Sequence, residues 1–344
     1  MIPQQESEFD IGYLKPYYGM LFPYADMLKW MSYGHVVPFI KLLLMYVLRQ
    51  FSFTFKDDFG FKHILWVNSR RRGVHCWVCD GKARRLTNEQ RASIADYFRV
   101  YKGNENSHNK VSLMGAALHP FLATSYTNVL KDYFEKILLT NQNLLATEER
   151  YENILSMIHD ECTFYYLRSL GMGRWQDNNR RSSSAKEDIN VMRWEQCKQL
   201  LQSGKHKAQG LRRCGRCVEE IVFFFTYPRL DMEVSKHMNH LLKAPFCVHP
   251  KTGRVRVPID PNRCDEFDPT TVPTLFQLLE ELNNEGLRAD VNGGIEWSGT
   301  SLGVGSAVTL FRSSFLEPLL KTCKEEIERS YSLKLQQSKN SIGW

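Results

Sequence analysis

The sequence has no apolar run long enough to cross a lipid bilayer. Its longest one, residues 36–48, is interrupted by Lys41 and falls short of the roughly 20 residues that a membrane-spanning helix needs. The opening of the chain is polar and acidic, so we expect no secretory signal peptide. Internal repeats are also lacking. These absences favour a soluble globular protein with no membrane partner.

The nine cysteines do not follow the spacing of a disulfide framework. We therefore expect reduced thiols in an intracellular protein. Two pairs have Cys-x-x-Cys spacing, which is typical of half a zinc site. Cys76 and Cys79 lie on a predicted strand with no second pair to complete the ligands, and Cys214 and Cys217 lie in a predicted loop region. We predict a metal ion at neither pair.

The chain does contain a modest excess of positive charge. It has 45 Lys and Arg residues against 38 Asp and Glu residues, a formal net charge of +7. This balance suits a polyanionic partner such as nucleic acid without requiring one. The hydrophobic fraction of 43% is ordinary, and 344 residues are enough for one large domain or two modest ones.

Hydrophobic periodicity predicts a mixture of strands and helices. Strand patterns occur at residues 51–55, 64–67, 74–78 and 221–225. Helical spacing occurs at residues 24–33, across much of 113–225, at 273–282 and at 315–331. Thr87 and Gln90 have the spacing of a capping box, which begins a helix. Within the strand at 74–78, His75 and Trp77 point to the same face because side chains alternate.

Residues 227–255 hold the densest group of side chains suited to phosphate chemistry. Asp231 follows the predicted strand at 221–225, and the cationic or proton-donating side chains of Lys236, His240, Lys243 and His249 come after it. A carboxylate can bind a divalent cation, while Lys and His can bind the phosphates that the cation also touches. Composition alone favours a simpler role for Asp231, that of capping a turn.

The motifs of this stretch resemble the small, catalytic subunit of eukaryotic and archaeal DNA primase. The stretch reads RLD, then SK, then NHLLKAPFCVHPKTGR, and the resemblance continues through VPID at 257–260 and EFDPTTVPT at 266–274. Two further blocks match in the same order, DFGFKHILWVNSRRRGVHCWVCD at 58–80 and YYGMLFPYADMLKWMSYG at 17–34. The details are most similar to a plant version.

The resemblance implies a mixed α/β fold, that of the primase small subunit, with an inserted helical subdomain. We expect a catalytic domain made of residues 1–99 and 227–344 and a helical subdomain at 100–226. The implied activity is nucleotidyl transfer, the DNA-templated synthesis of short RNA primers from ribonucleoside triphosphates with Mg²⁺ or Mn²⁺. The implied partners are template DNA, a primase large subunit and DNA polymerase alpha, in the nucleus.

The resemblance also assigns residues to the site. Asp231 falls on the third metal-binding carboxylate of the family and is the implied catalytic residue. The positions that match contacts to the incoming triphosphate are Arg49, Ser69, Arg71, Arg72, His75, Lys243 and His249. We expect Asp231, at the end of a buried strand, to face these cationic side chains across one cleft. Arginine suits the task because its planar fork binds phosphate oxygens in pairs.

One departure from the family pattern concerns the metal site. The family has a long segment, carrying an Asp-x-Asp pair and the cysteines of a structural zinc site, where Phe55 here runs almost directly into Asp58. Both features are missing from this catalytic sheet, and two metal ions need several carboxylates. An alternative is therefore a catalytically defective or truncated variant that keeps nucleotide or partner binding only. Loss of a strand would also leave neighbouring strand edges unpaired, which favours aggregation.

Overall fold

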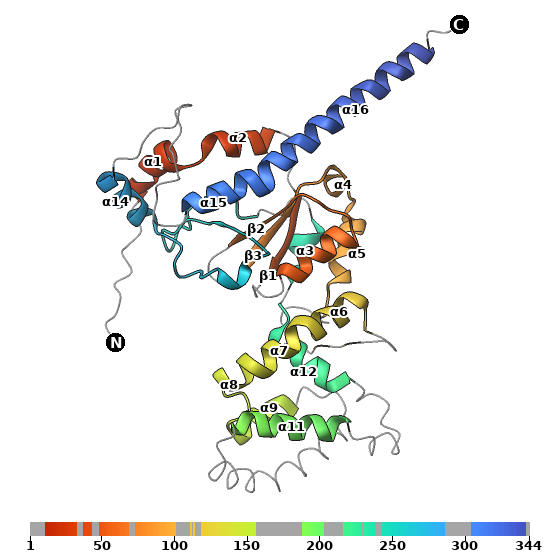
Figure 1. Ribbon diagram of the computed structural model, residues 1–344, viewed down its shortest axis with the longest axis vertical. Coiled ribbons are helices and arrows are strands. Elements are labelled where there is room, and N and C mark those ends of the chain that lie inside the picture. Colours follow the sequence, from red (N-terminus) through yellow and green to blue (C-terminus); the bar gives the residue numbers. More distant parts are fainter. Residues whose placement is uncertain are drawn as a thin grey trace. The chain divides into compact units, whose positions relative to one another are not determined.

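The computed structural model describes residues 11–32, 37–42, 48–68, 73–100, 111, 113, 118–155, 188–202, 216–228, 230–237, 242–285 and 304–341. The chain divides into two compact units (Figure 1). One comprises Met1–Tyr97 together with Leu230–Trp344, and the other comprises Phe98–Arg229. The sequence-based expectation placed the boundaries after residues 99 and 226.

The first unit contains an antiparallel four-stranded sheet with the strand order β1-β3-β2-β4. Its strands are β1 (Val37–Leu42), β2 (Ile64–Asn68), β3 (Val74–Val78) and β4 (Pro258–Ile259). The strands predicted at 64–67 and 74–78 are confirmed. The apolar run at 36–48 supplies β1, which pairs with β3 from Val78 to Val74. The expectation of an unpaired edge is therefore wrong for β3.

This unit also contains helices. They are η1 (Ile11–Tyr13), α1 (Leu14–Pro16), η2 (Tyr17–Leu21), α2 (Tyr24–Ser32), α3 (Leu48–Asp57), α4 (Gly81–Arg84), α5 (Asn88–Tyr97), α13 (Met232–Lys236), η8 (Cys264–Glu266), α14 (Leu275–Glu285), α15 (Val304–Leu310), η10 (Phe311–Leu316) and α16 (Glu317–Ser341). The helices predicted at 24–33 and 273–282 are confirmed as α2 and α14. The capping box before α5 is also confirmed, because Thr87 N donates to Gln90 Oε1 over 2.9 Å and Gln90 N donates to Thr87 Oγ1 over 3.3 Å.

The last helix is longer than the prediction of 315–331. Residues 332–341 contain neither Gly nor Pro, so nothing in their sequence ends the helix before Ser341. Figure 1 shows α16 as a long helix that leads to the carboxyl end of the chain. Among the helices of the described residues, none combines the length and the apolar character needed to cross a membrane.

The second unit is helical in its described part, as predicted for much of 113–225. Its helices are α6 (Pro120–Ser125), η4 (Tyr126–Leu130), α7 (Lys131–Tyr133), η5 (Phe134–Leu138), α8 (Leu139–Asn141), α9 (Glu148–Leu155), α11 (Ile189–Gln202) and α12 (Cys217–Thr226). Buried polar side chains join them. Arg193 Nη1 donates to the backbone oxygen of Leu145 over 2.6 Å, and Trp194 Nε1 donates to Glu135 Oε1 over 2.9 Å.

Two segments that were predicted as strands are helices. At 51–55 the alternation of Phe with Ser and Thr predicted one apolar face, but Phe51 and Phe55 are fully buried while Phe53 is 49% exposed. Burial at positions 48, 51, 52 and 55 follows the helical period, which gives α3. The apolar run at 221–225 lies within α12. A short apolar run fits a buried helix as well as a strand, and here the helix is the structure.

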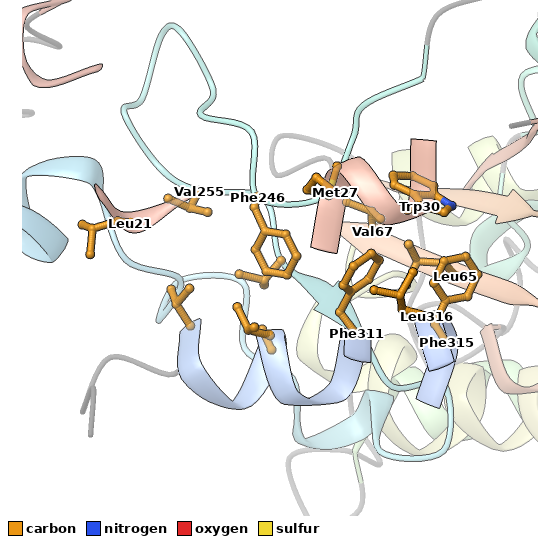
Figure 2. Close-up of a cluster of buried hydrophobic side chains, with 14 of the residues drawn as sticks. Leu21, Met27, Trp30, Leu65, Val67, Phe246, Val255, Phe311, Phe315 and Leu316 are labelled. Atoms are coloured by element: carbon orange, nitrogen blue, oxygen red, sulfur yellow. The ribbon is translucent and has the colours of Figure 1, made fainter. Parts of the chain in front are cut away.

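The main core lies on one face of the sheet. Leu65 and Val67 of β2 point into it, together with Trp30 of α2 and the aromatic side chains of η10 (Figure 2). The ring of Trp30 lies 5.2 Å from that of Trp77 in an edge-on arrangement. On the other face of the sheet, Trp66 Nε1 donates to Ser52 Oγ of α3 over 2.7 Å. Because the side chains of β2 alternate, they contact helices on both faces of the sheet.

Candidate functional site

Asp231 is the N-cap of the short helix α13. Its Oδ1 accepts a hydrogen bond from Val234 N over 3.3 Å, and its backbone oxygen accepts one from Ser235 Oγ over 3.1 Å. Aspartate is favoured at this position because its carboxylate pairs with a helix donor that has no partner within the helix. The prediction that Asp231 follows a buried strand is wrong, because the preceding element is α12. Capping, which composition alone favoured, is one role of this carboxylate.

Helix α13 packs on α5 and beside β1. Arg91 of α5 is fully buried, and its Nε donates to the backbone oxygen of Lys236, at the last turn of α13, over 3.3 Å. Burial lowers the pKa of Arg91 to about 10, so the guanidinium is charged at neutral pH. A cation at the carboxyl end of a helix is favourable. Arg91 therefore holds the helix that carries Asp231 at its other end.

The side chains of His75 and Trp77, both on β3, form hydrogen bonds with the backbone of Lys243. Lys243 N donates to His75 Nδ1 over 3.4 Å, and Trp77 Nε1 donates to the backbone oxygen of Lys243 over 3.2 Å. The prediction that His75 and Trp77 share a face is confirmed, because both reach the same residue. His75 is buried, whereas the ammonium-bearing side chain of Lys243 is exposed. With Nδ1 as acceptor, a neutral His75 ring carries its proton on Nε2.

His249 lies in a tight turn. Its backbone oxygen accepts from Gly253 N over 2.9 Å, and Thr252 Oγ1 lies 3.1 Å from its ring Nδ1. Gly253 has a φ of +61°, a conformation that glycine adopts without steric cost. Arg254 ties the turn to the following segment, because its Nη1 donates to the backbone oxygen of Val272 over 2.7 Å. The HPKTGR block therefore folds as a fixed turn.

Arg49 lies on helix α3 and not at the start of a strand, which corrects the predicted setting. Its Nη2 donates to the backbone oxygen of Asn262, in the loop after β4. Ser69, Arg71 and Arg72 lie outside the described residues, between the end of β2 and Gly73. The structure thus brings His75 and Lys243 together. The hydrogen bonds of Asp231 stay within its own helix, so the shared cleft with the cationic residues stays a prediction.

The described residues do not fit the ligand set of a two-metal site. They contain no group of three or more His, Cys, Asp or Glu side chains placed to hold a metal ion. The carboxylate nearest to Asp231 in sequence, Glu233, lies 3.5 Å from Lys236 Nζ and 3.5 Å from His237 Nε2. Burial raises the pKa of Cys79 to about 12 and that of Cys76 well above its usual value, so both are protonated thiols at neutral pH.

Sequence reasoning missed two residues that shape this region, Trp77 and Arg91. The strand period did place Trp77 beside His75, but its partner Lys243 is 166 positions away in the chain. In the sequence, Arg91 is one polar residue of an amphipathic helix, and nothing there indicates that it is buried. A signal for neither pairing exists in the local sequence.

Comparisons with known proteins give the class to which this mixed α/β fold belongs. The family model described as "DNA primase small subunit" matches residues 42–261, more than half of the chain. The chain therefore belongs to the DNA primase small subunit family. It is 40% identical over 257 residues to the DNA primase small subunit of Schizosaccharomyces pombe, covering 74% of this chain and 53% of that protein.

Other relatives are similar over the same share. The chain is 36% identical to the DNA primase small subunit of Drosophila melanogaster, covering 68% of this chain and 52% of that protein. It is 37% identical to that of Saccharomyces cerevisiae, covering 67% of this chain and 53% of that protein. The chain spans about half the length of the curated relatives it matches. The resemblance to a plant version stays a prediction.

Proposed function

We propose that the protein acts as the catalytic small subunit of a DNA primase, joining ribonucleoside triphosphates into short RNA primers on a DNA template. Family membership supports this, as do relatives that are all named DNA primase small subunit. The observation that carries the proposal for this chain is the fixed backbone of Lys243. Its side chain is exposed, and its backbone N–H donates to the buried ring of His75.

These two residues suit a triphosphate in different ways. Lys243 supplies a point charge on an anchored backbone, and His75 supplies an imidazole ring of fixed position beside that backbone. In the proposal, Ser69, Arg71 and Arg72, which lie outside the described residues, add further phosphate contacts, because arginine pairs with phosphate oxygens through two parallel hydrogen bonds. His249 and Arg49 complete the set of triphosphate contacts. Together these groups orient the incoming nucleotide and neutralise its charge.

Asp231 is the proposed metal-binding and catalytic carboxylate, with Mg²⁺ or Mn²⁺ as the metal. This carboxylate also caps α13, and the described residues contain no group of three or more metal-ligating side chains around it. Because that set does not fit two metal ions, no step of the reaction is assigned to a metal held by this chain. Structural zinc, which the family has, is not part of the proposal for this chain.

The remaining partners are proposed from the family alone. They are template DNA, a primase large subunit and DNA polymerase alpha, with the nucleus as the location. The net charge of +7 is compatible with a nucleic-acid partner.

A primer-synthesis assay tests the proposal. Purified full-length chain, with and without a primase large subunit, is incubated with a single-stranded DNA template, labelled ribonucleoside triphosphates and Mn²⁺. We expect dinucleotide and longer products that disappear in Asp231→Ala. Asp268→Ala is the matched control, because Asp268 also uses a carboxylate oxygen to accept a backbone N–H, that of Thr270 over 2.7 Å. Each substitution therefore removes one local hydrogen bond from a backbone N–H to a carboxylate.

The same assay separates the proposal from the alternative of nucleotide or partner binding without synthesis. Wild-type protein that binds ribonucleoside triphosphates but makes no product, even with the large subunit, would establish the alternative. Equal loss of product in Asp231→Ala and Asp268→Ala would show that Asp231 acts only as a cap.

A further inference from the structure

Arg256 is a buried cation in the segment that follows the HPKTGR turn. Its backbone N donates to the oxygen of Cys247 over 3.0 Å, and its own oxygen accepts from Phe246 N over 2.6 Å. The flanking residues Val255 and Val257 are part of the main core. Because the segment is extended, Arg256 points to the opposite side from them. Tyr18 and Cys247 are its neighbours there.

Among the described residues, the Arg256 side chain has no counter-ion. The residue is 4% exposed, and its Nε has no hydrogen-bond partner. Within the described part of the chain, no carboxylate forms an ion pair with it. Burial lowers the pKa of this guanidinium, which shows that the charged form is poorly solvated. Arg91 and Arg193 also have one buried nitrogen without a hydrogen-bond partner, but each donates through another nitrogen to a backbone oxygen. A buried charge without a partner is costly, and such sites are commonly completed by a ligand.

The position of Arg256 places it with the phosphate-binding candidates. Asn68, the last residue of β2, donates its N–H to the oxygen of Val257 over 3.0 Å. Arg256 is therefore next to the end of β2, where the segment with Arg71 and Arg72 begins. Cys247 lies close enough to both Lys243 and Arg256 for each cation to favour its ionised form, although burial dominates and raises the Cys247 pKa.

We propose that Arg256 is an additional anion-binding residue, whose guanidinium takes a phosphate group beside Lys243. The inference rests on the proposed function, because it assigns a further contact to the same site. Phosphate oxygens are the shared chemistry. They can come from a nucleoside triphosphate or from a nucleic-acid backbone, and a planar guanidinium pairs well with either.

The test uses the full chain with Arg256→Gln and Arg256→Lys. Arg263→Gln is the matched control, because it makes the same change at an exposed arginine that pairs with Glu266. Melting temperatures are measured without ligand, and affinities are measured for inorganic tripolyphosphate, a ribonucleoside triphosphate and a single-stranded DNA oligonucleotide without terminal phosphates. Removal of an uncompensated buried charge should leave the ligand-free melting temperature of Arg256→Gln at or above that of the wild type.

We expect Arg256→Gln to weaken tripolyphosphate binding about tenfold, Arg256→Lys to weaken it less, and Arg263→Gln to leave it unchanged. A loss confined to the oligonucleotide also supports anion binding and assigns the phosphate to nucleic acid. If Arg256→Gln fails to fold, the affinities of Arg256→Lys test the inference, because lysine keeps the positive charge and lacks the planar guanidinium. A lower melting temperature with unchanged affinity for all three probes would overturn the inference.

Lys243→Ala distinguishes failure of this inference from failure of the proposed function. If Lys243→Ala weakens tripolyphosphate binding and neither Arg256 variant does, the triphosphate site stands without Arg256. If wild-type protein binds none of the three probes, both proposals fail.

Discussion

The indole of Trp77 donates a hydrogen bond of 3.2 Å to the backbone oxygen of Lys243, and the adjacent backbone N–H of Lys243 donates to His75. Both side chains come from one face of β3. A strand in the middle of the sheet thus fixes the position of a loop lysine through its peptide groups. The exposed ammonium can then vary its rotamer while its attachment point stays in place.

Trp77→Phe should lower affinity for a ribonucleoside triphosphate several-fold, by about 1 kcal/mol, because it removes one of the two bonds that hold Lys243. Trp77 acts through Lys243, so primer synthesis should show a larger change in KM than in kcat. Binding and steady-state kinetics on the same preparation measure both.

Trp66→Phe is the control for Trp77→Phe. It removes a comparable indole bond, that to Ser52 Oγ, on the other face of the sheet. Both variants should lose stability, and only Trp77→Phe should lose triphosphate affinity. Parallel losses of affinity in the two variants would make the effect one of general packing.

Arg91→Met should lower the free energy of unfolding by about 1–3 kcal/mol, because it leaves the partly buried oxygen of Lys236 without its charged donor. It should also reduce primer synthesis, since α13 carries Asp231. Denaturant unfolding and product formation at a temperature where the variant is folded measure the two effects. If Arg91→Met is destabilised but keeps full activity, primer synthesis does not depend on the way Arg91 positions α13.

The lowered pKa of His63 predicts that the protein loses stability in acid. Burial lowers the pKa of His63, the carboxylates of Asp80 and Glu326 oppose that shift, and Lys62 adds to it. The unfolded chain therefore takes up the proton at a higher pH than the folded chain. Stability from neutral His63 is fully present above about pH 6.5 and decreases as the pH falls below that value.

His63→Gln removes this titration and tests it. The melting temperature of the variant should fall less than that of the wild type between about pH 7 and pH 5, whatever its value at pH 7. Identical slopes for the two proteins would show that His63 does not contribute.

The elements that the sequence predicts correctly are those with local signals. The antiparallel strands β2 and β3 are separated by a short polar stretch of sequence, and the Thr87–Gln90 pair marks the start of α5 by its spacing. The strand predictions at 51–55 and 221–225 are wrong because the local patterns there are compatible with a helix as well as with a strand. Residues 51–55 alternate like a strand, and only their packing, with Phe53 outside, selects the helix.

The site is less predictable because its contacts are long-range. The motifs identify His75 and Lys243, but only the fold shows that they touch and that Trp77 joins them. Arg256 is one residue of a short extended segment, and its lack of a counter-ion cannot be read from its neighbours in the chain. The sequence offers two roles for Asp231, metal binding and capping. Its hydrogen bonds show the capping role.

The central claim is that the anchored Lys243 holds the triphosphate of an incoming nucleotide. Calorimetric titration of a ribonucleoside triphosphate into wild-type protein and Lys243→Ala tests it most directly. The account predicts an affinity about tenfold weaker for the variant at an unchanged melting temperature, because an exposed ammonium contributes little to folding. Equal affinities for the two proteins would contradict it.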